Sequence, residues 1–101
     1  MSRSLGHVVL AGARDLLRTP DDWAQGAFRQ GRRRCVDEAI VESARRITKS
    51  RKDRRAVAHS ARRLIFAQMG FRHARDIHRW NDDNKRTFAE VVGLLDRCLA
   101  A

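Results

Sequence analysis

Apolar residues recur along the chain at intervals of three and four, which is the spacing of a helix that buries one face. Ser4, Ser50 and Thr87 each stand just before such a segment, where a helix-capping residue is expected. Gly70 follows the longest of these segments and can end it. The pattern therefore predicts four main helices, over residues 4–18, 35–48, 51–69 and from residue 88 onward.

Two shorter segments lie between these helices. Pro20 is followed by two acidic residues, which suits the first turn of a helix, and this helix is expected to run to about Gln30, where Gly31 can stop it. Residues 72–80 can form a further short helix, ahead of a polar turn that is expected at residues 81–84.

Strand patterns are weak throughout the chain. No window of four to eight residues alternates strictly between apolar and polar residues or clusters β-branched ones. We therefore expect an all-α fold, a compact bundle of four main helices plus one short helix, in a single domain over residues 1–101. Its core is expected to hold most of the aromatic area, which is carried by Trp23, Phe28, Trp80 and Phe88.

The charge of the chain adds information about its partners. The 101 residues carry 22 lysines and arginines against 12 acids, which gives a net charge of +10. A surplus of this size disfavours acidic adaptor roles and small-molecule enzymes with a neutral surface, and it favours polyanionic partners. The surplus is local, since residues 45–63 hold nine of the cations and one acid. These cations are the candidate nucleic-acid-binding residues, namely Arg45, Arg46, Lys49, Arg51, Lys52, Arg54, Arg55, Arg62 and Arg63.

A helical projection of residues 51–69 separates an apolar arc from a cationic one. The arc expected to pack on the core holds Val57, Ala61, Leu64, Ile65 and Gln68. The opposite arc, expected to face solvent, holds Arg54, Arg55, His59, Arg62 and Arg63. Arginine forks bind phosphate groups in two-point contacts, so the preferred hypothesis is nucleic-acid binding that positions the backbone without reading sequence.

Other interpretations of the cationic segment stay open. Of the 22 cations 19 are arginines, a bias that a GC-rich coding sequence can produce, and a charged helix face is usually a solvated one. The same surface suits a protein-interaction or inhibitor module that docks an acidic partner, and spare apolar surface suits a homodimer.

The residue types that catalyse reactions or bind metals are not spaced as an active site or a metal site requires. The four histidines show no pair at the helical spacing of metal ligands, so no metal and no cofactor is expected. Cys35 and Cys98 lie within helical patterns and are expected to be buried thiols in a cytoplasmic protein. No apolar run reaches the length of a membrane span, so no membrane partner is expected. We therefore expect a protein that is not an enzyme.

Two motifs resemble those of a known family. One is the run from Trp23 to Phe28, a W-x-Q-G-A motif, and the other starts at Trp80 and continues as W-N-D-x-x-x-R-T-x-x-E-V. Together they resemble a family of short all-helical bacterial and phage proteins of unknown function, and the resemblance covers the whole chain. That family has a Cys-x-x-Gly-Ala element in its middle helix, whereas the segment from Cys35 to Ala39 lacks the glycine. The resemblance implies no activity.

The two motifs also have a purely structural interpretation. Thr87 and Glu90 are spaced as a reciprocal helix cap, and an asparagine followed by an aspartate can bond its own backbone in a turn. The alternative is a binding pocket, which would be lined by Trp23, Gln25, Trp80, Asn81 and Asp82.

Overall fold

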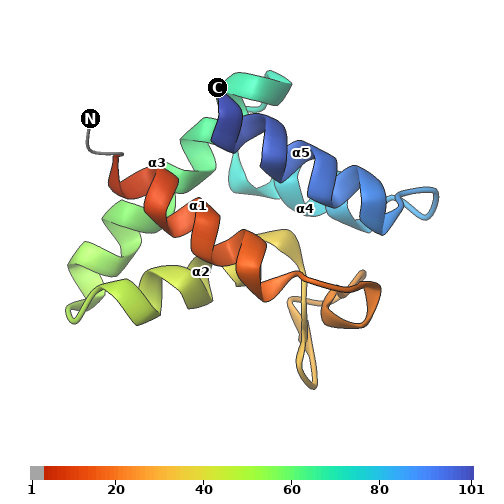
Figure 1. Ribbon diagram of the computed structural model, residues 1–101, viewed down its shortest axis with the longest axis horizontal. Coiled ribbons are helices and arrows are strands. Elements are labelled where there is room, and N and C mark those ends of the chain that lie inside the picture. Colours follow the sequence, from red (N-terminus) through yellow and green to blue (C-terminus); the bar gives the residue numbers. More distant parts are fainter. Residues whose placement is uncertain (1–3) are drawn as a thin grey trace.

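The computed structural model describes residues 4–101, and helices account for most of them. This confirms the prediction of a mostly helical, compact chain (Figure 1). The elements in order are α1 (Leu5–Leu16), the 3-10 turn η1 (Pro20–Asp22), β1 (Arg29–Gln30), β2 (Arg33–Arg34), α2 (Val36–Ile47), α3 (Arg51–Met69), α4 (Ala74–Asp82) and α5 (Phe88–Ala100).

Local capping explains where the helices begin and end. The Ser4 hydroxyl accepts a hydrogen bond from the backbone of His7, and the Ser50 hydroxyl accepts one from the backbone of Asp53. Gly70 adopts a left-handed conformation, with φ of 71°, and closes α3. These start and stop signals are short-range, which is why the sequence pattern predicts them.

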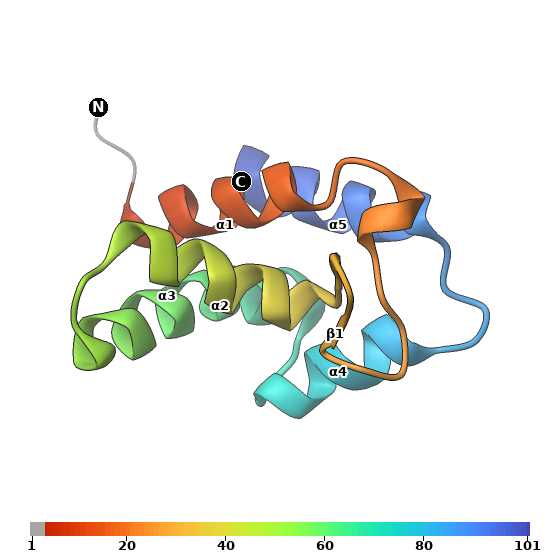
Figure 2. The ribbon, with the colours of Figure 1, turned by 90° about the horizontal axis from the view of Figure 1, so that it is seen from below.

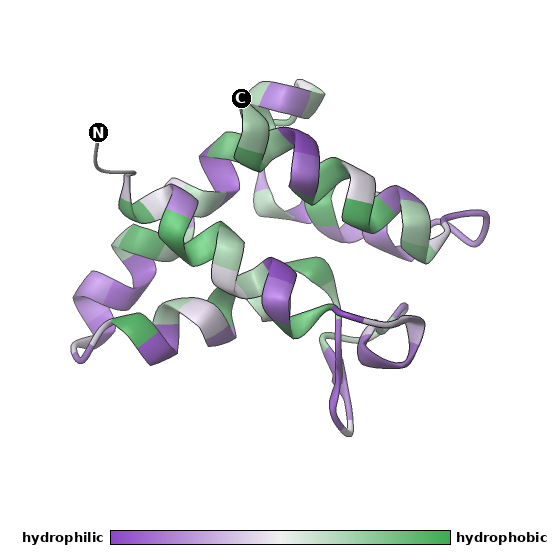
Figure 3. Cartoon of the chain, viewed as in Figure 1, coloured by the Kyte–Doolittle hydropathy of each residue, from purple (hydrophilic) through white to green (hydrophobic). Residues whose placement is uncertain are grey.

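The helices pack in two layers around one core. Figure 2 shows α1 and α5 in one layer, with α2, α3 and α4 in the other. The layers meet through fully buried aliphatic side chains such as Leu10, Ile40, Ile65, Ile77 and Leu94. In Figure 3 the apolar residues gather where the helices cross, while the hairpin of β1 and β2 and the connection from α2 to α3 are mostly hydrophilic.

Helix α1 approaches α2 so closely that a side chain larger than hydrogen has no room at Gly12. A Cβ atom built there would lie 2.2 Å from the hydroxyl oxygen of Ser43. Ser43 is buried, and its hydroxyl donates a 2.7 Å hydrogen bond to the Val9 carbonyl of α1. Gly12, Val9 and Ser43 therefore form a close contact where α1 meets α2.

Replacing Gly12 with alanine is expected to lower the free energy of unfolding by about 1–2 kcal/mol, since overpacking outweighs the gain in helix propensity. Urea denaturation measures this change. Adding Ser43→Ala removes the clashing hydroxyl, so the double variant should be at least as stable as Gly12→Ala alone. A double variant less stable than Gly12→Ala would contradict the close approach.

The segment from residue 20 to residue 34 differs from the prediction, which was wrong to extend a helix from Pro20 to Gln30. Only residues 20–22 form a helical turn, and the chain then forms a two-stranded antiparallel hairpin. Gly26 and Gly31 have φ values of 76° and 61°, a left-handed conformation that interrupts a helix at both places. Backbone bonds then hold the extended segment, from Ala24 to the Arg34 carbonyl and from Cys35 to the Phe28 carbonyl.

Three predicted placements were also wrong. Phe28, expected in the core, is 56% exposed because it lies at the base of the hairpin. Gln68, expected on the packed arc of α3, is exposed near the end of that helix. Asn81 and Asp82, expected in a turn, form the last residues of α4.

Candidate nucleic-acid interface

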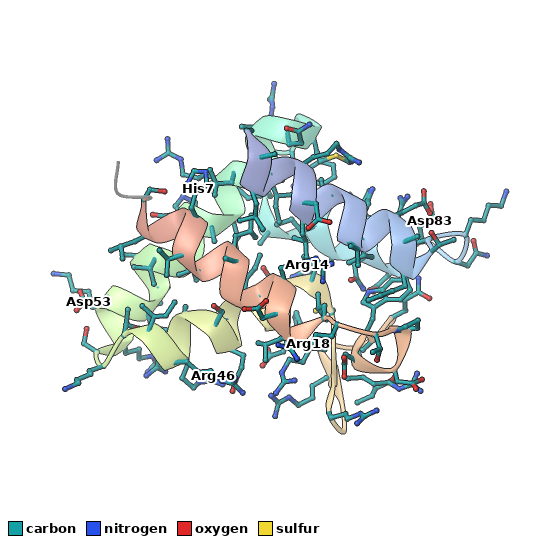
Figure 4. All side chains as sticks on the ribbon, viewed as in Figure 1. His7, Arg14, Arg18, Arg46, Asp53 and Asp83 are labelled. Carbon is teal, nitrogen blue, oxygen red and sulfur yellow. The ribbon has the colours of Figure 1, made fainter. Side chains whose placement is uncertain are left out.

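The candidate cations cluster where α2 passes into α3. Ser50 caps α3 so that the helix begins at Arg51, directly after the α2–α3 connection that carries Lys49. Figure 4 labels Arg46 and Asp53 on either side of this corner. We call the exposed members the cationic surface, which consists of Arg45, Arg46, Lys49, Arg51, Lys52, Arg55 and Arg63.

Along α3 the exposed cations follow one stripe. A spacing of three or four residues places the cations Lys52, Arg55 and Arg63, with the imidazole of His59 between them, on the outer face of the helix, and all four side chains are exposed. Arg51, Lys52 and Arg55 line a shallow open depression at the start of the stripe. This face therefore presents cations side by side to solvent.

Five members of the cationic surface have no carboxylate partner within residues 4–101. No ion pair of the described chain includes Lys49, Arg51, Lys52, Arg55 or Arg63. Asp53, the one acid in this stretch, also forms no such pair in the described chain. A surface with several uncompensated cations attracts polyanions and releases their counterions on binding.

Arg62 does not belong to the exposed arc, which corrects the helical projection. Its guanidinium group donates from Nε and Nη2 to the two carboxylate oxygens of Asp37, at 2.7 Å and 3.0 Å. The Arg62 side chain is 20% exposed and that of Asp37 is 7% exposed. Position 62 borders the face of α3 that packs through Ala58 and Ile65, so its side chain lies against α2. Arg62 is thus a structural residue.

Arg54 is also displaced from the expected exposed arc. It shares a face with the buried residues Ala58 and Ala61, four and seven positions later, and is half-buried in the first turn of α3. Its Nε atom is buried without a hydrogen-bond partner in the described chain. Arg54 therefore lies at the margin of the cationic surface.

Arg45 and Arg46 are partly neutralised by one acid, Glu42. Its carboxylate pairs with Arg45, with Arg46 at 3.4 Å and with Arg29 of the hairpin at 3.9 Å. Burial favours the neutral acid, but the hydrogen bond from Arg45 and the nearby arginine charges outweigh it and hold the pKa of Glu42 below its usual value. One carboxylate shared among three guanidinium groups leaves net positive charge at this point.

The cations of the hairpin were not among the candidate binding residues predicted from the sequence. Arg29, Arg32 and Arg33 are all exposed. When charges are summed over a longer segment, acids nearby in the sequence balance these arginines. The arginines therefore do not stand out as a cationic cluster. The signal that points to them is the pair of glycines, Gly26 and Gly31, because two turn-forming residues five positions apart disfavour a helix.

The two family-like motifs meet in a second location, which we call the clasp: Trp23, Ala24, Gln25, Gly26, Asn81 and Asp82. The side chain of Asn81 is fully buried and uses all its hydrogen-bonding capacity. Its Oδ1 accepts from Trp23 Nε1 at 2.8 Å and from the Val36 backbone at 3.0 Å, while its Nδ2 donates to the Ala24 carbonyl and to Asp82. The clasp thus fastens the segment before α2 to the end of α4.

Gln25 and Trp80, which were also expected to line a pocket, are likewise used for internal contacts. Gln25 donates to the backbone carbonyls of Asn81 and Asp83, at 3.0 Å and 2.8 Å. Trp80 is half-buried, and the guanidinium carbon of Arg86 lies 4.1 Å from the centre of its ring. These side chains therefore stabilise the fold where they meet.

A cavity of about 220 Å³ lies beside the clasp and is lined by Gly26, Ala27, Phe28, Cys35, His78 and Asp82. Burial raises the pKa of the Cys35 thiol to about 11, so the thiol is protonated at neutral pH. His78 Nε2 lies 3.2 Å from Asp37, and Asp82 Oδ1 already accepts two hydrogen bonds. In residues 4–101 no three histidine, cysteine or acidic side chains are placed to hold a metal ion.

Fold and surface together define a small helical protein with a localised cationic face. The chain belongs to the family of unknown function DUF6197, whose model matches residues 3–101. Neither a curated protein nor a solved structure matches it. Among the described residues, no helix combines the length and apolar composition needed to cross a membrane.

Proposed function

We propose that this protein binds nucleic acid without enzymatic activity or cofactor, by contacting the sugar-phosphate backbone with its cationic surface. The observation that carries the proposal is the set of five cations at the α2–α3 corner and along α3 that have no carboxylate partner in the described chain: Lys49, Arg51, Lys52, Arg55 and Arg63. A reducing cytoplasm suits the two free cysteines.

These residues favour contact with the sugar-phosphate backbone of the nucleic acid, without readout of the bases. The exposed stripe of α3 consists of lysine, arginine and histidine, and it lacks the asparagine or glutamine side chains that pair with adenine in a groove. Arginine and lysine on a helix surface bind phosphate whatever the base sequence. The proposal therefore includes weak sequence preference.

Affinity for a duplex of about 20 base pairs should fall about a hundredfold between about 50 and 200 mM salt, if four phosphates are engaged. Fluorescence anisotropy with several unrelated sequences measures both this slope and the sequence preference. The triple variant Lys52→Gln, Arg55→Gln, Arg63→Gln should lower affinity at low salt and reduce the slope by about three.

The matched control is Arg75→Gln, Arg79→Gln, Lys85→Gln, which removes the same residue types from exposed positions around α4. This control should keep most of the affinity, because its net charge changes equally but the cationic surface stays intact. Equal losses in the two triple variants, or no binding by the unmodified protein at low salt, would contradict the proposal.

Docking to another protein is the second candidate function. Leu5, Val8 and Ile47 are 58%, 42% and 41% exposed, and the last two line an open groove between α1 and α2. Exposed apolar side chains in one region suit an interface with a partner or a second copy. Sedimentation analysis of the purified protein distinguishes the two candidates, since a stable dimer that binds no nucleic acid favours the second.

A further inference from the structure

The hairpin of β1 and β2 is a second, separate group of cations. Arg29 pairs with Arg34 and Gln30 with Arg33, with Gly31 and Arg32 at the tip. Gly31, with φ of 61°, permits the tight turn. In Figure 1 the hairpin projects from the packed helices, and the Arg32 side chain is 74% exposed. It therefore presents arginines beyond the body of the molecule.

Two ion pairs of the hairpin are long, and the arginine of each is exposed. Arg33 lies 3.4 Å from Asp21, and Arg32 lies 3.9 Å from Asp22. Exposed pairs at such distances contribute little and exchange readily with a competing anion. The two guanidinium groups are thus free to bind phosphate or base edges when a stronger acceptor is offered.

The hairpin and the cationic surface approach each other at one margin of that surface, where Arg29 of β1 lies near Arg45 and Arg46 of α2. Arg29 of β1 and Arg45 and Arg46 of α2 all reach the carboxylate of Glu42. In Figure 4 Arg46 extends from α2 at the edge from which the hairpin also projects. A single carboxylate therefore separates two groups of cations that a continuous polyanion could span.

We propose that the hairpin enters the major groove of B-form DNA while the cationic surface holds the adjacent backbone. This inference rests on the proposed function and names its partner. A two-stranded ribbon fits the major groove of B-form DNA, whereas the major groove of duplex RNA is too deep and narrow for side chains to read. Arginines at the tip can bind the acceptor edge of guanine or the flanking phosphates.

Single strands fit this surface less well. Proteins that hold single strands stack successive bases on exposed aromatic side chains. In residues 4–101, Phe28 alone among the aromatic residues is mostly exposed, and its ring packs edge-on against His78, with centroids 5.0 Å apart. One aromatic ring at the base of the hairpin gives no row of stacking positions, so the duplex is the favoured partner.

The test compares three probes of one sequence at low salt: a DNA duplex of about 20 base pairs, the corresponding RNA duplex and the single DNA strand. The unmodified protein is expected to bind the DNA duplex about tenfold more tightly than the RNA duplex. The variant Arg32→Gln, Arg33→Gln should remove this preference, while Arg75→Gln, Arg79→Gln should retain it.

The outcomes separate the two proposals. If the unmodified protein binds none of the three probes, the proposed function fails. If it binds them and the hairpin variant keeps the preference for the DNA duplex, or if there is no such preference, the hairpin inference alone is overturned.

Glu42 gives an independent check of the same inference. Its carboxylate lies between the two groups of cations, so Glu42→Gln removes a charge that repels phosphate and releases Arg29 and Arg45. This variant is expected to bind the DNA duplex several-fold more tightly. Asp96→Asn, an equal change of charge on α5, should have little effect. No gain in affinity for Glu42→Gln would contradict a polyanion that spans both groups.

Discussion

Replacing Asn81 with alanine is expected to lower the free energy of unfolding by about 3–5 kcal/mol, a large part of the stability of a small domain. The fully buried side chain of Asn81 accepts from Trp23 Nε1 and from the Val36 backbone, and it donates to the Ala24 carbonyl. Alanine leaves the Val36 amide and the Ala24 carbonyl buried without these partners, and the half-buried Trp23 Nε1 loses its acceptor. Each unsatisfied buried group contributes about 1–3 kcal/mol of destabilisation.

The loss should be visible as a local opening as well as a lower urea midpoint. Trp23 would lose its partner, so tryptophan fluorescence should shift to the red, and the Val36 backbone amide should exchange faster with solvent. Asn84→Ala is the matched control, since Asn84 is exposed in the α4–α5 connection and makes no hydrogen bond in the described chain. A loss below about 1 kcal/mol for Asn81→Ala would show that the clasp is dispensable.

The clasp explains which part of the fold the sequence could predict. The helices that begin at Leu5, Arg51 and Phe88 depend on caps and apolar spacing within a few residues, so local pattern is enough to place them. The segment before α2 is held instead by bonds from Trp23 and Gly26 to residues more than 50 positions later in the chain. Helix propensity cannot anticipate such bonds, and the predicted helix there was wrong.

The same distinction applies to the candidate interface. The cluster of cations in residues 45–63 is visible in the sequence, and the three- and four-residue spacing places Lys52, Arg55 and Arg63 on one exposed stripe. The partner of Arg62 is not visible, because Asp37 stands 25 residues earlier on another helix. Spacing predicts which side chains share a face, whereas packing between helices decides which cations are neutralised.

This separation has a consequence for function. Because Asp37 holds Arg62 and Glu42 holds Arg45 and Arg46, the cations that remain without partners lie at the α2–α3 corner and on the outer stripe of α3. Arginines held by carboxylates of the fold and arginines that we propose contact phosphate thus alternate within a single segment. Variants that remove all of them together would confuse loss of folding with loss of binding.

Asp37 provides the second large effect, and Asp37→Ala is expected to destabilise the protein by about 2–4 kcal/mol. Its carboxylate is 7% exposed and accepts two hydrogen bonds from Arg62, while His78 Nε2 lies 3.2 Å away. Without it the guanidinium group, only 20% exposed, keeps its charge in a position where water replaces the carboxylate poorly. Breaking one side of a buried pair is therefore more harmful than losing an exposed pair.

Urea denaturation of Asp37→Ala, Arg62→Ala and the double variant tests this through a thermodynamic cycle. The double variant should be destabilised by less than the sum of the two single changes, because it leaves no unpaired charge. Asp53→Asn, which removes the same charge from an exposed position on α3, should change stability by less than about 0.5 kcal/mol. Strict additivity in the cycle would mean that Asp37 and Arg62 act independently, and Arg62 would then return to the set of residues available for phosphate.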